Sequence, residues 1–133
     1  MKIEIVTFWI FKLIAAGILL HTLFFKFFAI KENVYIFSAL GIEMDGIICL
    51  SLLELLIAIL ILIPTTTISG AILGSIMMIG AIISHLWVFG IEIQNDNGFL
   101  FVRAVITLIC CQRLLFFTKN KLFEILKLRY ACY

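Results

Sequence analysis

The chain has 133 residues with a formal net charge of +2, and 65% of its residues are hydrophobic. A soluble domain is about 45–50% apolar, so this composition and a mean hydropathy of +1.26 indicate an integral membrane protein without a separate soluble catalytic domain. Neither a P-loop, a Rossmann glycine motif nor a nucleophile elbow occurs, and no surface for nucleic acid is predicted.

The first apolar stretch predicts a transmembrane helix from about Phe8 to Phe28. Its length exceeds the roughly 7–15 residues of a signal-peptide core, and no small-residue cleavage site follows, so we do not expect it to be cleaved. Lys12 lies near the helix start and is expected to snorkel to the membrane interface. His21 should lie well inside the helix, and Lys26 near its far end.

A more polar segment, residues 31–45, follows this helix. It predicts a loop with a short helix from Asn33 to Ala39 lying at the membrane interface. Gly41 should end that helix, because glycine favours the left-handed conformation found after helix C-termini.

Two long apolar runs occupy the middle of the chain and predict helices over about Gly46–Ile63 and Ile68–Phe89. Each is long enough to cross a bilayer core, which takes about 20 helical residues. Only Pro64 and three threonines separate the main apolar runs. The two helices should therefore form an antiparallel transmembrane hairpin.

Each helix of this hairpin carries one ionisable residue on a face of small or polar residues. Ser51, Glu54 and Ala58 share one face of the first, and such a face packs against other helices rather than lipid. In the second, a stripe that includes Gly74, the end of a G-x-x-x-G match, reaches His85. Both ionisable side chains are therefore predicted to point into the bundle.

A fourth helix is predicted from about Phe99 to Phe117, with Arg103 one turn inside it. The remaining residues form a short basic amphipathic segment that suits an anionic membrane surface. We therefore expect a four-helix transmembrane domain over residues 1–118 and a surface-bound tail over residues 119–133.

The predicted fold is all-α, an antiparallel bundle of four transmembrane helices in a lipid bilayer. Lysine and arginine are concentrated at the end of the bundle that holds both termini, and cytoplasmic segments are enriched in these residues. The termini should therefore be cytoplasmic.

Five ionisable side chains should lie in the outer half of this bundle: Lys26, Glu54, His85, Arg103 and His21. A charged group at mid-helix costs at least about 2.5–3.5 kcal/mol in lipid, so we expect them to share one polar pocket. Glu54 and His85 should come close enough for a hydrogen bond, directly or through one water. Lys26 or Arg103 should complete the cluster.

A structural interpretation of these residues stays open, because buried polar groups also join helices through hydrogen bonds worth roughly 0.6–2 kcal/mol. For Glu54 and His85 this interpretation and a ligand or proton role stand side by side. Lys26 and Arg103 lie near the interface, where snorkelling or pairing with loop acids is common. A histidine in the position of His21 is more often a buried residue with its hydrogen bonds satisfied than a ligand. No spacing of the H-x-x-E-H type points to a metal.

The four cysteines, at positions 49, 110, 111 and 132, do not form a C-x-x-C motif. We interpret them as small apolar residues of the helices. A redox role for Cys110 and Cys111 is the alternative.

Several segments together resemble the DoxX-like family of small bacterial four-helix membrane proteins. They are LHTLFFKFF at 20–28, YIFSALGIE at 35–43, LLELLIAILILIP at 52–64, SGAILGSIMMIGAIISHL at 69–86 and GIEIQNDNGFLF at 90–101. On this pattern, motif positions of the family fall on Lys26, Glu54, Pro64, Met78 and His85.

The resemblance implies a protein of the bacterial inner membrane. It also implies a small membrane subunit of a redox system linked to quinones or thiols, rather than an enzyme on its own. The family is named for a subunit associated with thiosulfate:quinone oxidoreduction, so a quinone or another lipophilic molecule is the implied ligand of the outer pocket. The alternative is a non-catalytic assembly protein for a membrane or redox partner, or for a second copy of the chain. Met44 and Ile47 stand where relatives often carry proline and arginine, so no role is implied for a loop arginine.

Overall fold

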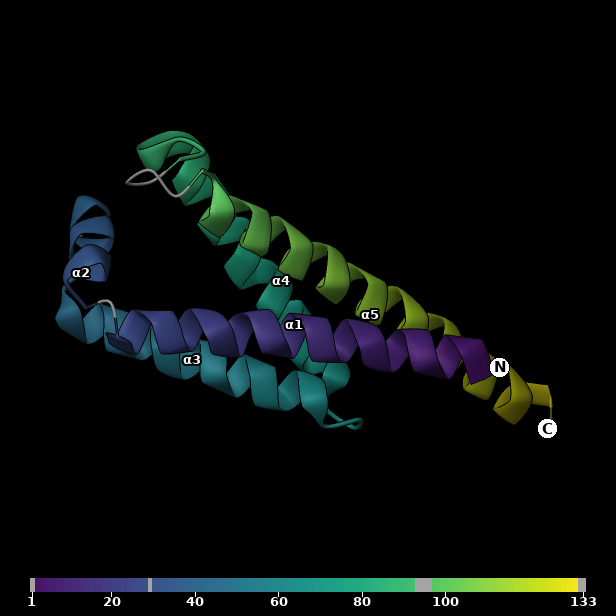
Figure 1. Ribbon diagram of the computed structural model, residues 1–133. Helices are drawn as coiled ribbons and strands as arrows, with labels where there is room; N and C mark the ends of the chain where they lie inside the picture. Colours follow the sequence, from purple (N-terminus) through teal and green to yellow (C-terminus); the bar gives the residue numbers. More distant parts are fainter. Residues whose placement is uncertain (1, 29, 93–96, 132–133) are drawn as a thin grey trace.

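The computed structural model describes residues 2–28, 30–92 and 97–131, and these residues form helices joined by short turns, with no strand among them. Four helical spans, one of which includes a terminal π-helical turn, are long and apolar enough to cross a membrane. Figure 1 shows them as a bundle whose two termini lie at the same end. The prediction of an all-α protein with four transmembrane helices is confirmed.

The first transmembrane helix, α1, runs from Lys2 to Phe28, and a short helix, α2, follows from Ile30 to Ala39. The turn after α2 closes with a hydrogen bond from the backbone N–H of Ile42 to the carbonyl of Phe37. Gly41 has a φ of +72° in this turn. It therefore ends α2 in the left-handed conformation that glycine adopts without strain.

The central hairpin consists of α3, Met44–Leu62, and α4, Thr67–Ser84. The turn between them is fixed by threonine hydroxyls that donate to the last carbonyls of α3. The Thr66 hydroxyl lies 3.0 Å from the carbonyl oxygen of Leu60. These bonds satisfy carbonyls that have no partner within the helix itself, so the chain can reverse direction in a few residues.

Two glycines of α4 allow the helices to approach closely. A Cβ atom added at Gly70 would lie 2.7 Å from the backbone nitrogen of Ile61. One added at Gly74 would lie 3.0 Å from Sγ of Cys111 and 3.3 Å from a side-chain carbon of Ile57. The G-x-x-x-G match therefore marks a real site of close contact between helices.

The third transmembrane span ends in a π-helical turn, η1, from His85 to Phe89. The last helix, α5, runs without a break from Phe99 to Ala131. Its 33 residues correspond to about 50 Å at 1.5 Å per residue. The predicted helix end near Phe117 is therefore wrong, because no glycine or proline interrupts the helix there. The assignment of residues 119–133 to a membrane-surface tail stays a prediction.

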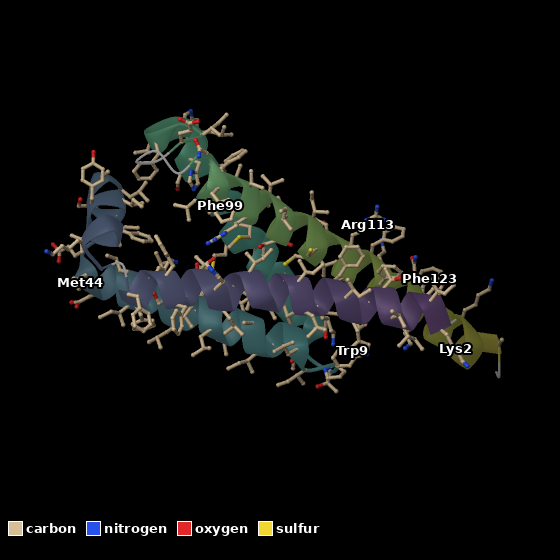
Figure 2. All side chains as sticks on the ribbon, in the orientation of Figure 1. Lys2, Trp9, Met44, Phe99, Arg113 and Phe123 are labelled. Carbon is tan, nitrogen blue, oxygen red and sulfur yellow. The ribbon has the colours of Figure 1, made fainter. Side chains whose placement is uncertain are left out.

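The two ends of the bundle differ. Helix α1 packs on α3 and α4 packs on α5, and Figure 1 shows these two pairs spreading apart towards the end that carries α2. We call this the open end; Met44 and Phe99 lie there in Figure 2, whereas Lys2 and Phe123 lie at the other. That other end, with the termini and the α3–α4 turn, is the close-packed end. The fully buried core side chains include Leu19, Ile57, Ile61, Cys111 and Leu114.

Lys12 departs from its expected position at the membrane interface. Its side chain is 0% exposed. The Nζ atom lies 4.8 Å from the ring centroids of both Phe8 and Trp9. It has no hydrogen-bond partner among the described residues. The expectation of snorkelling is wrong, because two aromatic faces hold the ammonium group inside the bundle.

Candidate functional site: a polar cavity at the open end

An ion pair joins the first two transmembrane spans near the open end. The Nζ atom of Lys26 on α1 lies 2.6 Å from Oε1 of Glu54 on α3. The antiparallel contact between these helices brings the end of α1 to the middle of α3. The two side chains are only 10% and 4% exposed. A pair this short and this buried is a charge-assisted hydrogen bond, and removal of either partner would strongly destabilise the fold.

The second carboxylate oxygen of Glu54, Oε2, is buried and has no hydrogen-bond partner among the described residues. Most buried polar atoms in proteins have a partner, and one left unsatisfied costs about 1–3 kcal/mol or more when charged. Among the described residues, only one of the two carboxylate oxygens of Glu54 therefore has a hydrogen-bond partner. The other oxygen, Oε2, can accept a hydrogen bond from a molecule that enters the site.

His85 is the first residue of the π-helical turn, and it is 9% exposed. Its ring meets the rings of Phe89 and Phe101 edge-on, with centroid distances of 6.3 Å and 5.9 Å. These contacts fix the plane of the imidazole. π-helical turns inside helices are rare and occur frequently at functional sites, which agrees with the position of His85 at the cavity described below.

Arg103 lies one turn into α5, and its guanidinium carbon is 4.2 Å from the ring centroid of Phe99. It forms no ion pair with a described carboxylate. The aromatic face supports the guanidinium on one side, while its N–H donors stay available to an oxygen acceptor. Sequence reasoning did not predict this aromatic contact.

These side chains line one cavity with a volume of about 490 Å³. Its walls are mainly apolar and come from all five α-helices and from η1, so the cavity lies between the two helix pairs. The polar and charged side chains on its wall are Thr22, Lys26, Glu54, Ser84, His85, Arg103 and Thr107. The apolar part includes Ile36, Phe37, Leu50, Leu53, Met77, Met78 and Leu100.

The structure brings together four of the five residues that the sequence grouped: Lys26, Glu54, His85 and Arg103. His21 is exposed on α1 and is not among the residues that line the cavity. Glu54 bonds to Lys26 and makes no direct hydrogen bond to His85. The direct form of the expected bond between Glu54 and His85 is therefore not formed, and the form through one water stays a prediction. Lys26 bonds to Glu54, in line with its expected place in the cluster.

Helix α2 is the part of the site that the sequence analysis did not assign to it. Ile36 and Phe37 contribute to the cavity wall, and the Phe37 ring centroid lies 5.4 Å from Nζ of Lys26. The segment was expected to lie at the membrane interface. Its apolar residues at 36, 37 and 40 already form a helical stripe in the sequence, and that stripe could have suggested a buried face.

None of the cysteines that the structure describes lies on the cavity wall. Cys110 and Cys111 are buried and free, and Cys49 is exposed and free; Cys132 lies outside the described residues. Within the described part of the chain, no three His, Cys, Asp or Glu side chains gather in a way that could hold a metal ion.

Comparison with known protein families identifies the family of this chain. A model of the DoxX-like family matches residues 10–111. This range contains most of the cavity, including the ion pair, His85 and Arg103. No curated protein and no solved structure matches the chain significantly.

Proposed function

The chain belongs to the DoxX-like family, and from this premise we propose that it is a small membrane subunit of a redox system that holds a quinone or another lipophilic molecule in its polar cavity. The observation that carries the proposal is Oε2 of Glu54, a buried acceptor without a described partner at a mainly apolar cavity. Glu54 lines this cavity, and a purely structural ion pair would have little reason to leave one of its carboxylate oxygens unbonded.

The size and lining of the cavity support a ligand of this class. Sites for small molecules measure about 300–1,000 Å³, are mostly apolar and carry a few polar groups that fix orientation. The volume here is about 490 Å³, with Lys26, Glu54, His85 and Arg103 as the ionisable groups on its wall. A ring with polar substituents would meet these groups, while the isoleucine, leucine, phenylalanine and methionine side chains would enclose its apolar part.

The roles available to the chain itself are binding, orientation and proton exchange. Glu54 and His85 can each hold a proton in this cavity, and Lys26 and Arg103 can stabilise negative charge on an oxygen. Electrons would move between the ligand and a partner redox protein. This division of roles favours a subunit over an enzyme that acts alone.

Binding measured in lipid nanodiscs tests the proposal directly. A radiolabelled short-chain quinone should bind the purified chain saturably, at about one molecule per chain. The double variant K26M/E54L removes the pair without leaving a lone charge and should abolish that binding. His21→Leu, on the same helix but outside the cavity wall, should retain it.

Absence of saturable binding to the native chain would overturn the proposed function. The assembly alternative would then gain support if the same preparation held a stoichiometric membrane partner. Under the proposal, a preparation that retains a membrane partner should also contain the bound lipophilic molecule.

We also propose that the open end faces away from the cytoplasm of a bacterial cell and that both termini are cytoplasmic. The support is the excess of lysine and arginine at the close-packed end, where Lys119, Lys121 and Lys127 are exposed on α5. A cysteine introduced at the exposed Ser38 of α2 should react with an impermeant maleimide from outside intact spheroplasts. Reaction only after lysis would reverse the orientation.

A further inference from the structure

We propose that the cavity selects a neutral head group that both donates and accepts hydrogen bonds, the chemistry of an alkylated phenol or hydroquinone. Glu54 would accept the hydrogen bond of its hydroxyl group, and Arg103 would donate to its second oxygen. The inference rests on the proposed function, since it concerns the same cavity, and it adds which form of a lipophilic ligand binds best.

The requirement for a donor comes from Glu54. One carboxylate oxygen is bonded to Lys26 at 2.6 Å, and the other is buried without a described partner. A carboxylate oxygen can only accept hydrogen bonds. A ligand that offered only carbonyl or ether oxygens would leave this oxygen unsatisfied on binding, and would also displace any water that serves it.

The requirement for an acceptor comes from Arg103. Its guanidinium group carries five N–H donors and no acceptor, and its described side-chain contact is with the Phe99 ring. It lines the same cavity as Glu54 from a different helix. A head group that reaches both residues must therefore offer a hydroxyl group to one and an oxygen atom to the other.

The charges at the cavity exclude the ionic alternatives. A carboxylate or phosphate head group would suit Arg103 but would face the unpaired oxygen of Glu54, and like charges placed together cost several kcal/mol. An alkylammonium head group would suit Glu54 but would meet the cations of Lys26 and Arg103 in the same cavity. A neutral head group with both hydrogen-bonding functions avoids both conflicts.

The apolar wall is consistent with an aromatic ring in this head group. Phe37, Met77 and Met78 line the cavity together with aliphatic side chains. Thioether sulfur makes favourable contacts with aromatic rings. The ring would fill the apolar part of the cavity while its two oxygens meet Glu54 and Arg103.

A series of probes that differ only in the head group tests the inference. An alkylated hydroquinone, its dimethyl ether, its oxidised quinone, and a fatty acid and an alkylamine of matched chain length would be titrated anaerobically into nanodiscs of zwitterionic lipid. The hydroquinone should bind about tenfold or more tightly than either the ether or the quinone, as expected for a hydrogen bond to a charged acceptor. The fatty acid and the amine should bind more weakly than the hydroquinone.

Two variants assign the selectivity to its residues. Glu54→Gln should bring the hydroquinone and the quinone to within about twofold of each other, because the glutamine amide can donate as well as accept. Continued binding of the quinone shows that this variant is folded. Arg103→Gln should weaken binding of both forms, whereas Arg113→Gln, exposed on α5 and outside the cavity wall, should change neither.

Failure of this inference is distinct from failure of the proposed function. If the quinone, the ether and the hydroquinone bind equally well, or if the fatty acid binds most tightly, the selectivity proposed here is wrong while the cavity remains a lipophile site. If no probe binds, both proposals fall.

Discussion

The close-packed end and the open end of this bundle are built from the same transmembrane helices, but the first is tightly packed and the second contains a cavity. At the close-packed end, glycines let α4 approach α3 and α5, and core side chains such as Ile61, Cys111 and Leu114 are 0% exposed. At the open end, a cavity of about 490 Å³ interrupts the contact between the helix pairs, and its wall carries an ion pair, a histidine and an arginine.

The comparison indicates where stability and binding reside. In lipid, burial of apolar surface does not drive helices together, because the lipid tails are apolar too. Association depends instead on the van der Waals attraction that tight contact between helices supplies. Hollow, charged regions are costly in the same environment. The close-packed end therefore stabilises the bundle, and the open end holds an arrangement that stability alone would not favour.

The largest expected effect comes from breaking the ion pair of the open end. Lys26→Met leaves the carboxylate of Glu54 buried without its partner, and removing one member of a buried pair costs about 3–5 kcal/mol. Reversible unfolding in mixed micelles would measure this change. The double variant K26M/E54L should return to within about 1 kcal/mol of the native chain, since apolar replacement of both partners is often neutral. Equal destabilisation by the single and double variants would contradict the account.

An intermediate effect is expected at the close-packed end. Gly70→Ala places a Cβ atom 2.7 Å from the backbone nitrogen of Ile61, so α3 and α4 must move apart. Overpacking of this kind costs about 1–3 kcal/mol. Gly17→Ala is the matched control, because nothing lies within 4 Å of an added Cβ at that position. The same micelle unfolding assay should show Gly17→Ala unchanged or more stable by up to about 1 kcal/mol.

Sequence patterns predicted the fold well because the physics that sets it is local. Four apolar runs give the transmembrane helices, and Pro64 and the threonines give the turn between α3 and α4. The end of α5 was not predicted, because a change from apolar to basic composition alters where a helix lies but not whether it continues. Only a residue such as glycine or proline would have ended it there.

The cavity was predicted in part for a related reason. The cost of isolated charges in lipid correctly grouped Lys26, Glu54, His85 and Arg103. The depth of a residue along its helix does not determine which face of the helix it occupies. His21 was grouped by depth, and it proved to be exposed. The choice of Lys26 over His85 as the partner of Glu54 depends on helix rotation and tilt, which periodicity does not determine.

The smallest expected effect contrasts Lys12 with Lys26. Lys12 has no described hydrogen-bond partner and lies against the rings of Phe8 and Trp9, whereas Lys26 has a carboxylate. Lys12→Met keeps most of the side-chain volume and leaves no charge behind, so the lost cation–π attraction of about 0.5–2 kcal/mol is offset by relief of desolvation. The free energy of unfolding should change by less than about 1 kcal/mol. A loss as large as that of Lys26→Met would reveal a partner that this account omits.

Photo-crosslinking tests most directly the central claim that the open end is the binding end. A phenol carrying a short alkyl chain and a diazirine would be activated in nanodiscs, and the labelled peptides would be mapped by mass spectrometry. We predict saturable labelling of the cavity wall, at Phe37, Met77 and Met78, that an excess of unlabelled hydroquinone removes. Labelling that is spread over the lipid-facing residues of all the helices and does not respond to competitor would contradict the account.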